Sequence, residues 1–311
     1  MQNLLISQVI PTAHSLHTTP VTSAATLIHP EDTPAWELER ARVITILKAS
    51  NQRSRYPQYA TGLTAARLLG LPILKAPDTI EVISKAPSNP RRTSFQNSHQ
   101  QIRRLQRAYP AEAYTEIKGF PMVSPNYLIL EVLRLPDAFA AFVTADAILR
   151  SLLATDHRLV NFRQYDIQQA KEALLEIATP EVLGRLTKRV THRIPLLDPY
   201  AESPAESILR LLLLQLGFAS LQSQHEVINP HGGFFYGDIL IPELKTICEA
   251  DGAGKYADAH AYRTEKERET ILTRAGYRVI RMHWKELTSS SALQILASKL
   301  GVDVPRRPRE I

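Results

Sequence analysis

The stretch GDILIPELKTICEADGAGKY, residues 237–256, limits what this chain can fold into, because it sets carboxylates inside two short apolar runs. Pro242 begins the expected turn between the runs, since proline fixes φ and cannot donate to a central ladder. The runs on either side predict two antiparallel strands of a small sheet. The carboxylates that interrupt the apolar pattern are Asp238, Glu249 and Asp251.

A register for this hairpin follows from its turn. We expect Ile241 to face Leu244 across a Pro-Glu turn. Asp238 then lies opposite Ile247 and diagonal to Glu249 on the same face, and the third carboxylate, two residues after Glu249, joins them. Diagonal neighbours have Cβ atoms about 7 Å apart, which is close enough for two carboxylates to share a cation.

Carboxylates held this close need a counter-charge, because each pair repels by about 3 kcal/mol at 5 Å and an effective dielectric of 20. Arginine or lysine would make them structural ion pairs. A divalent hard cation such as Mg²⁺, which takes one or two carboxylates with water and phosphate oxygens, fits the spacing better. In that case the metal-free protein is strained, and Glu249→Gln is expected to be at least as stable as the unaltered chain.

Composition sets the broad class of the protein. With 311 residues, 44% of them apolar, the chain has room for two domains with a real core. Lys and Arg number 37 against 31 acidic residues, a net charge of +6 that is compatible with a polyanionic partner. The single cysteine, Cys248, cannot form an intramolecular disulfide. We find no secretory signal and no apolar run of about 18 residues, so we expect a cytoplasmic protein with no membrane partner.

Three regions follow one another along the chain. Residues 1–30, rich in Thr, Ser, His and Pro, are expected to be poorly ordered. Residues 31–195 predict a mostly helical domain, with helices at AWELERARVITILKAS and TGLTAARLLGLPI and a strand at DTIEVISKAP. The proline-containing segment THRIPLLDPYAESP marks the boundary, and residues 196–311 form the second domain.

A basic stretch within the first domain, residues 85–107, holds six Lys or Arg side chains and no acid. Two interpretations remain open. The charges either protect a solvated loop and edge strand or contact the phosphates of a nucleic acid. The candidates for phosphate contact are Arg103, Arg104 and Arg107.

The second domain has a clearer pattern. Ser203 as N-cap, Pro204 at the first helical position and Gly217 after the last turn predict a helix. Strands at SQHEVINP, FFYGDILI and LKTICEAD follow, then a long helix ended by Gly276, the strand YRVIRMHW and a final helix. The order αβββαβ predicts an α/β fold in the broad sense. Its arrangement is α+β, with parallel and antiparallel strands in one mixed sheet.

This order, with Asp on one strand and Glu at the end of the next, resembles the restriction-endonuclease-like core of the PD-(D/E)XK nuclease superfamily. The motifs SPAES, GDILIPELKTICEADGAGKY, EKERETILTRAGYRVIR and HWKEL, over about residues 201–288, look like those of very-short-patch-repair-like endonuclease domains. Upstream, TGLTAARLLGLPI and GFPMVSPNYLILEVLR resemble the region that accompanies this domain in AbiEi-like antitoxins.

The resemblance implies roles for individual residues. Asp238 and Glu249 would bind Mg²⁺, with Mn²⁺ able to substitute, and Glu206 would hold a metal-bound water. Asp251 stands where the superfamily signature has Lys, so Lys255 would supply the cationic role. Each role has a structural alternative: Glu206 completes a capping box with the serine three residues before it, and the lysine is an ordinary solvated side chain.

Three further basic residues, Lys266, Arg268 and Arg281, are candidates for phosphate contacts, because the first two lie on the long helix and the third on the adjoining strand. The alternative for the helix is a solvated, charged face. The resemblance implies a metal-dependent endonuclease with DNA as partner, in which the N-terminal region positions DNA or a protein partner. The alternative is a nucleic-acid-binding, antitoxin-like regulator that keeps the nuclease fold without useful catalysis.

Overall fold

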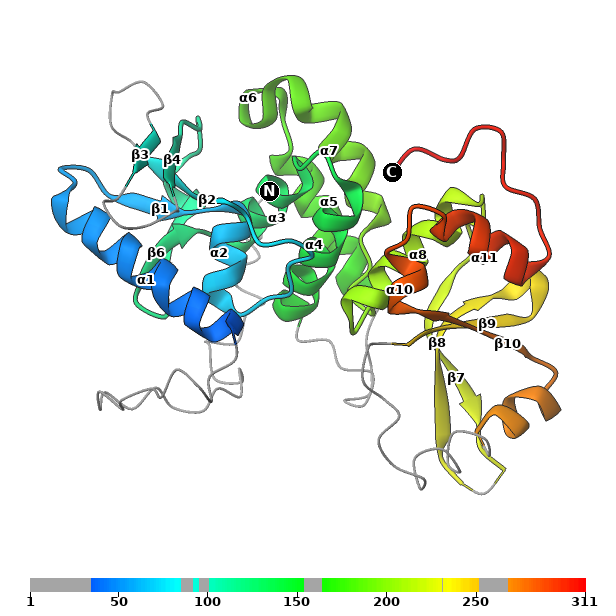
Figure 1. Ribbon diagram of the computed structural model, residues 1–311. Coiled ribbons are helices and arrows are strands. Elements are labelled where there is room, and N and C mark those ends of the chain that lie inside the picture. Colours follow the sequence, from blue (N-terminus) through cyan, green and yellow to red (C-terminus); the bar gives the residue numbers. More distant parts are fainter. Residues whose placement is uncertain (1–34, 85–91, 95–100, 154–163, 231, 252–267) are drawn as a thin grey trace. The chain divides into compact units, whose positions relative to one another are not determined.

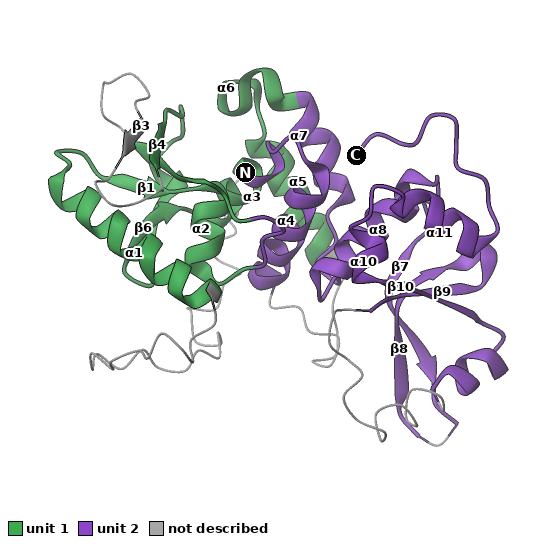
Figure 2. Ribbon diagram, in the orientation of Figure 1, with its two compact units in different colours: residues 1–71, 76–131, 165–187 green, residues 72–75, 132–164, 188–311 purple. Residues whose placement is uncertain are grey.

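The computed structural model has a mixed α/β fold divided into two compact units, which are described separately (Figure 1, Figure 2). No helix in the described part of the chain has the length and apolar character to cross a membrane. The structure describes residues 35–84, 92–94, 101–153, 164–230, 232–251 and 268–311. The first unit comprises residues 1–71, 76–131 and 165–187, and the second residues 72–75, 132–164 and 188–311.

The first unit contains a mixed sheet with the strand order β3-β4-β2-β1-β6-β5. The pairs β1 with β6 and β2 with β4 are parallel, whereas the central pair β1 with β2 and the two outer pairs are antiparallel. The expected strand DTIEVIS is β2, but β1, β5 and β6 are too short to give a periodic signal. The strands are β1 (Gln58–Ala60), β2 (Thr79–Ser84), β3 (Arg92–Ser94), β4 (Gln101–Leu105), β5 (Tyr114–Ile117) and β6 (Phe120–Val123).

The helices of the first unit include the two predicted at AWELERARVITILKAS and TGLTAARLLGLPI. The helix α2 ends at Gly70, whose φ of 76° is the left-handed conformation that glycine adopts without strain. The expected stop signal is therefore confirmed. The helices are α1 (Ala35–Arg53), α2 (Gly62–Leu69), α5 (Gln164–Ile177) and α6 (Pro180–Leu183), while α3 (Pro125–Leu133) runs from the first unit into the second.

The second unit follows the predicted order closely. Its sheet has the strand order β10-β9-β8-β7, with β9 and β10 parallel and the other pairs antiparallel. Residues 268–274 are helical and precede β10. The elements are α4 (Ala138–Leu153), α7 (Thr187–Arg193), α8 (Pro204–Gln215), β7 (Gln222–Ile228), β8 (Phe234–Ile241), β9 (Thr246–Asp251), β10 (Arg278–His283), α10 (Trp284–Leu287) and α11 (Ala292–Leu300).

Apolar side chains cover both faces of this four-stranded sheet. On one face, Cys248 and Ile280 pack in a cluster with leucines of α8 and α11. On the other face, Ile247 packs with Leu272 from the helical residues 268–274. Because side chains alternate along a strand, Glu249 shares the second face with Ile247.

The division into units differs from the boundary expected near residue 195, because the second unit also takes in residues 132–164 and 188–195. The physical reason is packing between α4 and α8. Asp146 of α4 accepts hydrogen bonds from Ser207 and Arg210 of α8, at 2.9 and 3.0 Å. A helix that precedes the nuclease-like sequence motifs is thus part of the same core.

Candidate functional site

The hairpin of β8 and β9 has a different register from the one predicted. Leu240 lies opposite Ile247, where the prediction placed Asp238, so the predicted register is wrong by two residues. The turn is longer than a Pro-Glu pair: it is a 3₁₀ turn followed by Lys245 in a left-handed conformation with φ of 46°. A shift of two residues preserves the alternation of faces, and Asp238 and Glu249 are the next residues on their strands beyond the last pair, Ile239 with Cys248.

Asp238 is fixed against the neighbouring strand by a hydrogen bond. Its Oδ2 atom accepts from the backbone N–H of Ala250 at 2.8 Å, so the side chain takes the place of a backbone acceptor. On the other side, Gln224 of β7 lies level with Asp238 and has a φ of 51°, which interrupts the ladder there. Asp238 is therefore held beside the segment that carries Glu249 and Asp251.

The glycine before Asp238 has a packing role. A Cβ atom on Gly237 would lie 2.6 Å from Cγ2 of Ile247, closer than real Cβ contacts allow. Glycine at this position leaves free the space that the Ile247 side chain occupies. The close approach fixes the strand immediately before the aspartate.

Glu249 is buried, with 4% of its surface exposed, and is neutralised by two arginines. Its Oε1 atom lies 2.8 Å from Nη2 of Arg268, and its Oε2 atom accepts from Nε of Arg281 at 3.1 Å. Arg281 is the register partner of Glu249 in the parallel pair of β9 and β10, and it also pairs with Glu269 at 3.2 Å. The prediction that Glu249 lacks compensation without a metal is therefore wrong.

Asp251 has a histidine beside it. His283 is its register partner on β10, and Nδ1 of His283 lies 3.5 Å from Oδ2 of Asp251. The histidine is 55% exposed and is also the N-cap of α10, where it forms a capping box with Glu286. The sequence interpretation did not single out His283, because only the parallel pairing of distant strands places it here.

A two-carboxylate site for Mg²⁺ matches the donor type that this cation prefers. Asp238 and Glu249 carry oxygen atoms of this type on neighbouring strands, where their present partners are the N–H of Ala250 and two arginines. Within the described ranges, no group of three or more His, Cys, Asp or Glu side chains is arranged to hold a metal ion. A cation at the pair would have to share Glu249 with Arg268 and Arg281.

Glu206 completes a capping box with Ser203 at the start of α8, as its position three residues after the serine allows. Its backbone N–H donates to Oγ of Ser203 at 3.2 Å, and its carboxylate accepts from that hydroxyl at 2.7 Å. Its Oε2 atom also accepts from the N–H of Glu202 and from Nε2 of Gln224, both at 2.9 Å. Burial raises the pKa of Glu206. Gln224, which donates this last hydrogen bond, lies across the β7–β8 pair from Asp238. The role of Glu206 in holding a metal-bound water stays a prediction.

The cationic residues expected at the site divide into two groups. Lys255 and Lys266 lie outside the described residues. Arg268 and Arg281 lie beside Glu249, so the structure brings both to the carboxylates. Their observed partner is a protein carboxylate, which is the structural ion pair that the sequence left open as the alternative to a metal.

Arginines of the basic stretch have acidic partners from other elements. Arg103 pairs with Glu81 of β2 at 3.1 Å, and Arg107 makes two hydrogen bonds to the buried Glu131 of α3, at 2.7 and 3.1 Å. Arg103 and Arg104 are consecutive in β4, so their side chains point to opposite faces. The three do not form one continuous row of free charges.

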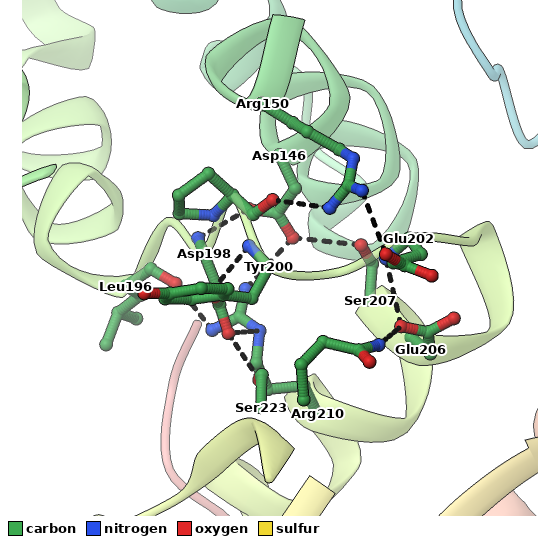
Figure 3. Close-up of polar contacts among 12 residues, drawn as sticks. Asp146, Arg150, Leu196, Asp198, Tyr200, Glu202, Glu206, Ser207, Arg210 and Ser223 are labelled. Atoms are coloured by element: carbon green, nitrogen blue, oxygen red, sulfur yellow. Dashed lines mark hydrogen bonds and ion pairs between the residues drawn. The ribbon is translucent and has the colours of Figure 1, made fainter. Parts of the chain in front are cut away.

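A buried polar network lies in the second unit and was missed at the sequence level (Figure 3). Arg210 of α8 donates to Asp146 at 3.0 Å and to the carbonyl oxygen of Leu196 at 2.6 Å, and it lies 3.6 Å from Asp198. Burial raises the pKa of Asp146, which has no exposed surface. The available signal was a charged residue inside an apolar helical run, in ILRLLLLQ and in FVTADAIL.

Comparisons of this chain with protein-family models, with curated proteins and with solved structures found no match.

Proposed function

We propose that the second unit is a metal-dependent endonuclease domain that hydrolyses phosphodiester bonds of DNA. The observation that carries the proposal is that Asp238 and Glu249 lie next to the last β8–β9 pair on neighbouring strands, where the β7–β8 ladder is interrupted and Asp238 accepts from the N–H of Ala250. The order of α8, β7, β8, β9, the helical residues 268–274 and β10 is consistent with the sequence resemblance.

Hydrolysis forms a phosphorus–oxygen bond to water and breaks the bond to one sugar oxygen, so one proton leaves the water and another reaches the leaving oxygen. Mg²⁺ held by Asp238 and Glu249 would supply a Lewis acid and lower the pKa of a bound water. His283, beside Asp251, is a candidate to accept the proton; its acceptor nitrogen would exchange the capping bond from the N–H of Glu286 for the water.

The two arginines at Glu249 have a role in this proposal. With Glu249 shared with a cation, the guanidinium groups of Arg268 and Arg281 would be available to phosphate oxygens, for which arginine has suitable donors. Cations at this position would stabilise the charge that develops on the phosphorane. Lys255 remains the proposed additional cation.

A second candidate function is supported by a specific observation. The two ion pairs already neutralise Glu249, and Asp251 occupies the position of the signature lysine. This arrangement favours a regulator that binds nucleic acid without cutting it. The first unit would then contact DNA or a protein partner.

The test is cleavage of supercoiled, linear and single-stranded DNA by the full chain, with Mg²⁺, with Mn²⁺ and with EDTA. Metal-dependent nicking is expected, and Asp238→Ala or Glu249→Ala should abolish it while salt-sensitive DNA binding persists. Glu269→Ala is the matched control, because it removes a carboxylate 3.2 Å from the same Arg281. Equal nicking by the Asp238 and Glu249 double variant contradicts the enzyme, and DNA binding without cleavage by the unaltered chain supports the regulator.

A further inference from the structure

A cavity of about 390 Å³ lies in the first unit. It is open to solvent on one side and lined by the last turns of α1, the segment that leads into β1, Leu68 of α2 and the turn between β5 and β6. This volume is within the range of sites for small organic ligands. None of the residues proposed for cleavage lines it.

The wall of the cavity is held in place by amide hydrogen bonds. The N–H of Gln58 donates to Oδ1 of Asn51 at 3.0 Å, and Nδ2 of Asn51 donates to the carbonyl oxygen of Gln58 at 3.4 Å. Oγ of Ser50 donates to Oε1 of Gln58 at 3.0 Å. These bonds join the end of α1 to β1, so the cavity is formed before any ligand binds.

The charged residues at and next to the cavity wall are mostly basic. Lys48 lines it, and no Asp or Glu side chain is among the lining residues. Arg53, Arg55 and Lys118 directly adjoin lining residues in the sequence, and no ion pair joins any of these four cations to another described residue. One acid, Glu116, lies opposite the lining Pro121 in the β5–β6 ladder. The charge balance favours an anionic ligand.

Aromatic rings complete the lining. Tyr56, 37% exposed, and Phe120 both face the cavity, and Nζ of Lys48 lies 5.7 Å from the centre of the Phe120 ring. The amide of Gln52 lines it as well. Aromatic faces beside a cation and an amide are the groups that bind an unpaired base with its phosphate.

We propose that this cavity binds a nucleotide unit, with the base against Tyr56 and Phe120 and the phosphate at Lys48. A base in a duplex is stacked and paired, so it cannot enter. The nucleotide is either free or part of a single strand, and the two sources share this chemistry.

The experiment measures binding to the full chain in EDTA, with thymidine monophosphate and with a labelled oligothymidylate of about eight nucleotides. Lys48→Ala should weaken binding about tenfold and flatten the plot of log affinity against log salt for the oligonucleotide by about 0.7. The matched control is Arg42→Ala, which removes the same charge from α1 at an exposed residue outside the cavity and should have little effect. Tyr56→Ala should also weaken binding about tenfold, whereas Tyr56→Phe keeps the ring and most of the affinity.

Binding of both probes, lost in Lys48→Ala, supports a site for the nucleotide itself. Binding of the oligonucleotide only, with the same loss, supports a site for an unpaired strand. The proposal is overturned if neither probe binds, if Lys48→Ala and Arg42→Ala weaken binding equally, or if Tyr56→Ala has no effect. Circular dichroism of each variant checks that its fold is intact.

Discussion

Replacing Arg210 with methionine removes the cation at the centre of the buried network in the second unit (Figure 3). Asp146 would keep its hydrogen bonds from Ser207 Oγ and from the N–H of Asp198, both at 2.9 Å. It would lose the guanidinium 3.0 Å from its Oδ2 atom while remaining without exposed surface. The substitution therefore leaves a buried carboxylate without its counter-charge.

The expected cost is large. Removing one partner of a buried ion pair destabilises a protein by about 3–5 kcal/mol. For a unit of this size each kcal/mol lowers Tm by about 2–4 °C, which gives a fall of roughly 6–20 °C in thermal melting followed by circular dichroism. Arg150→Met is the matched control: Arg150 and its partner Glu202 are 23% and 29% exposed, so its loss should cost at most about 1 kcal/mol.

The pH dependence gives a second check on Arg210→Met. Burial raises the pKa of Asp146, and the nearby Arg210 opposes that rise, so the substitution raises the pKa further. An acid whose folded-state pKa is raised stabilises the fold when protonated, and this contribution is lost as pH rises through the folded pKa. The deficit of the variant should therefore shrink as pH falls toward the ordinary Asp pKa. A deficit no larger than that of Arg150→Met would refute the reasoning.

Three further predictions concern other parts of the chain. Burial raises the pKa of Cys248 to about 12, so a thiol reagent at pH about 8 should label the unfolded but not the folded protein; rapid labelling of the folded protein contradicts the buried position. A fragment of residues 132–311 should melt well above one of residues 196–311, because the shorter one lacks α4; equal melting contradicts the unit boundary. Replacing Arg103 and Arg104 with glutamine should flatten the salt dependence of DNA binding by about 1.8 if both contact phosphate, and an unchanged slope excludes those contacts.

Local signals predicted the elements of the second unit well. Ser203 and Pro204 begin α8 as expected, and helical residues 268–274 end just before Gly276, whose φ is 87°. Such caps depend on a few neighbouring residues, so the sequence contains them. The hairpin register failed for the opposite reason, because the conformation of Lys245 after the proline turn lengthened the loop by two residues.

Long-range partners could not be predicted from the sequence. The arginine pairs of Glu249 depend on the parallel pairing of β9 with β10 and on the position of residues 268–274. In the same way, Glu131 neutralises Arg107 from a helix 24 positions along the chain, although the basic stretch contains no acid of its own. At both places the charge is balanced between elements rather than within them.

The central claim is that Asp238 and Glu249 hold a divalent cation, and thermal melting of the full chain in EDTA and in Mn²⁺ tests it most directly. At one hundred times its dissociation constant, a cation that binds only the folded state adds about 2.7 kcal/mol. Asp238→Asn and Glu249→Gln should each lose most of this gain. In EDTA, Glu249→Gln should be less stable than the unaltered chain by roughly 1.5–3 kcal/mol, because Arg268 and Arg281 lose a charged partner. The claim would be contradicted if Mn²⁺ does not raise the melting temperature of the unaltered chain. It would also be contradicted if Mn²⁺ stabilises the two variants as much as the unaltered chain.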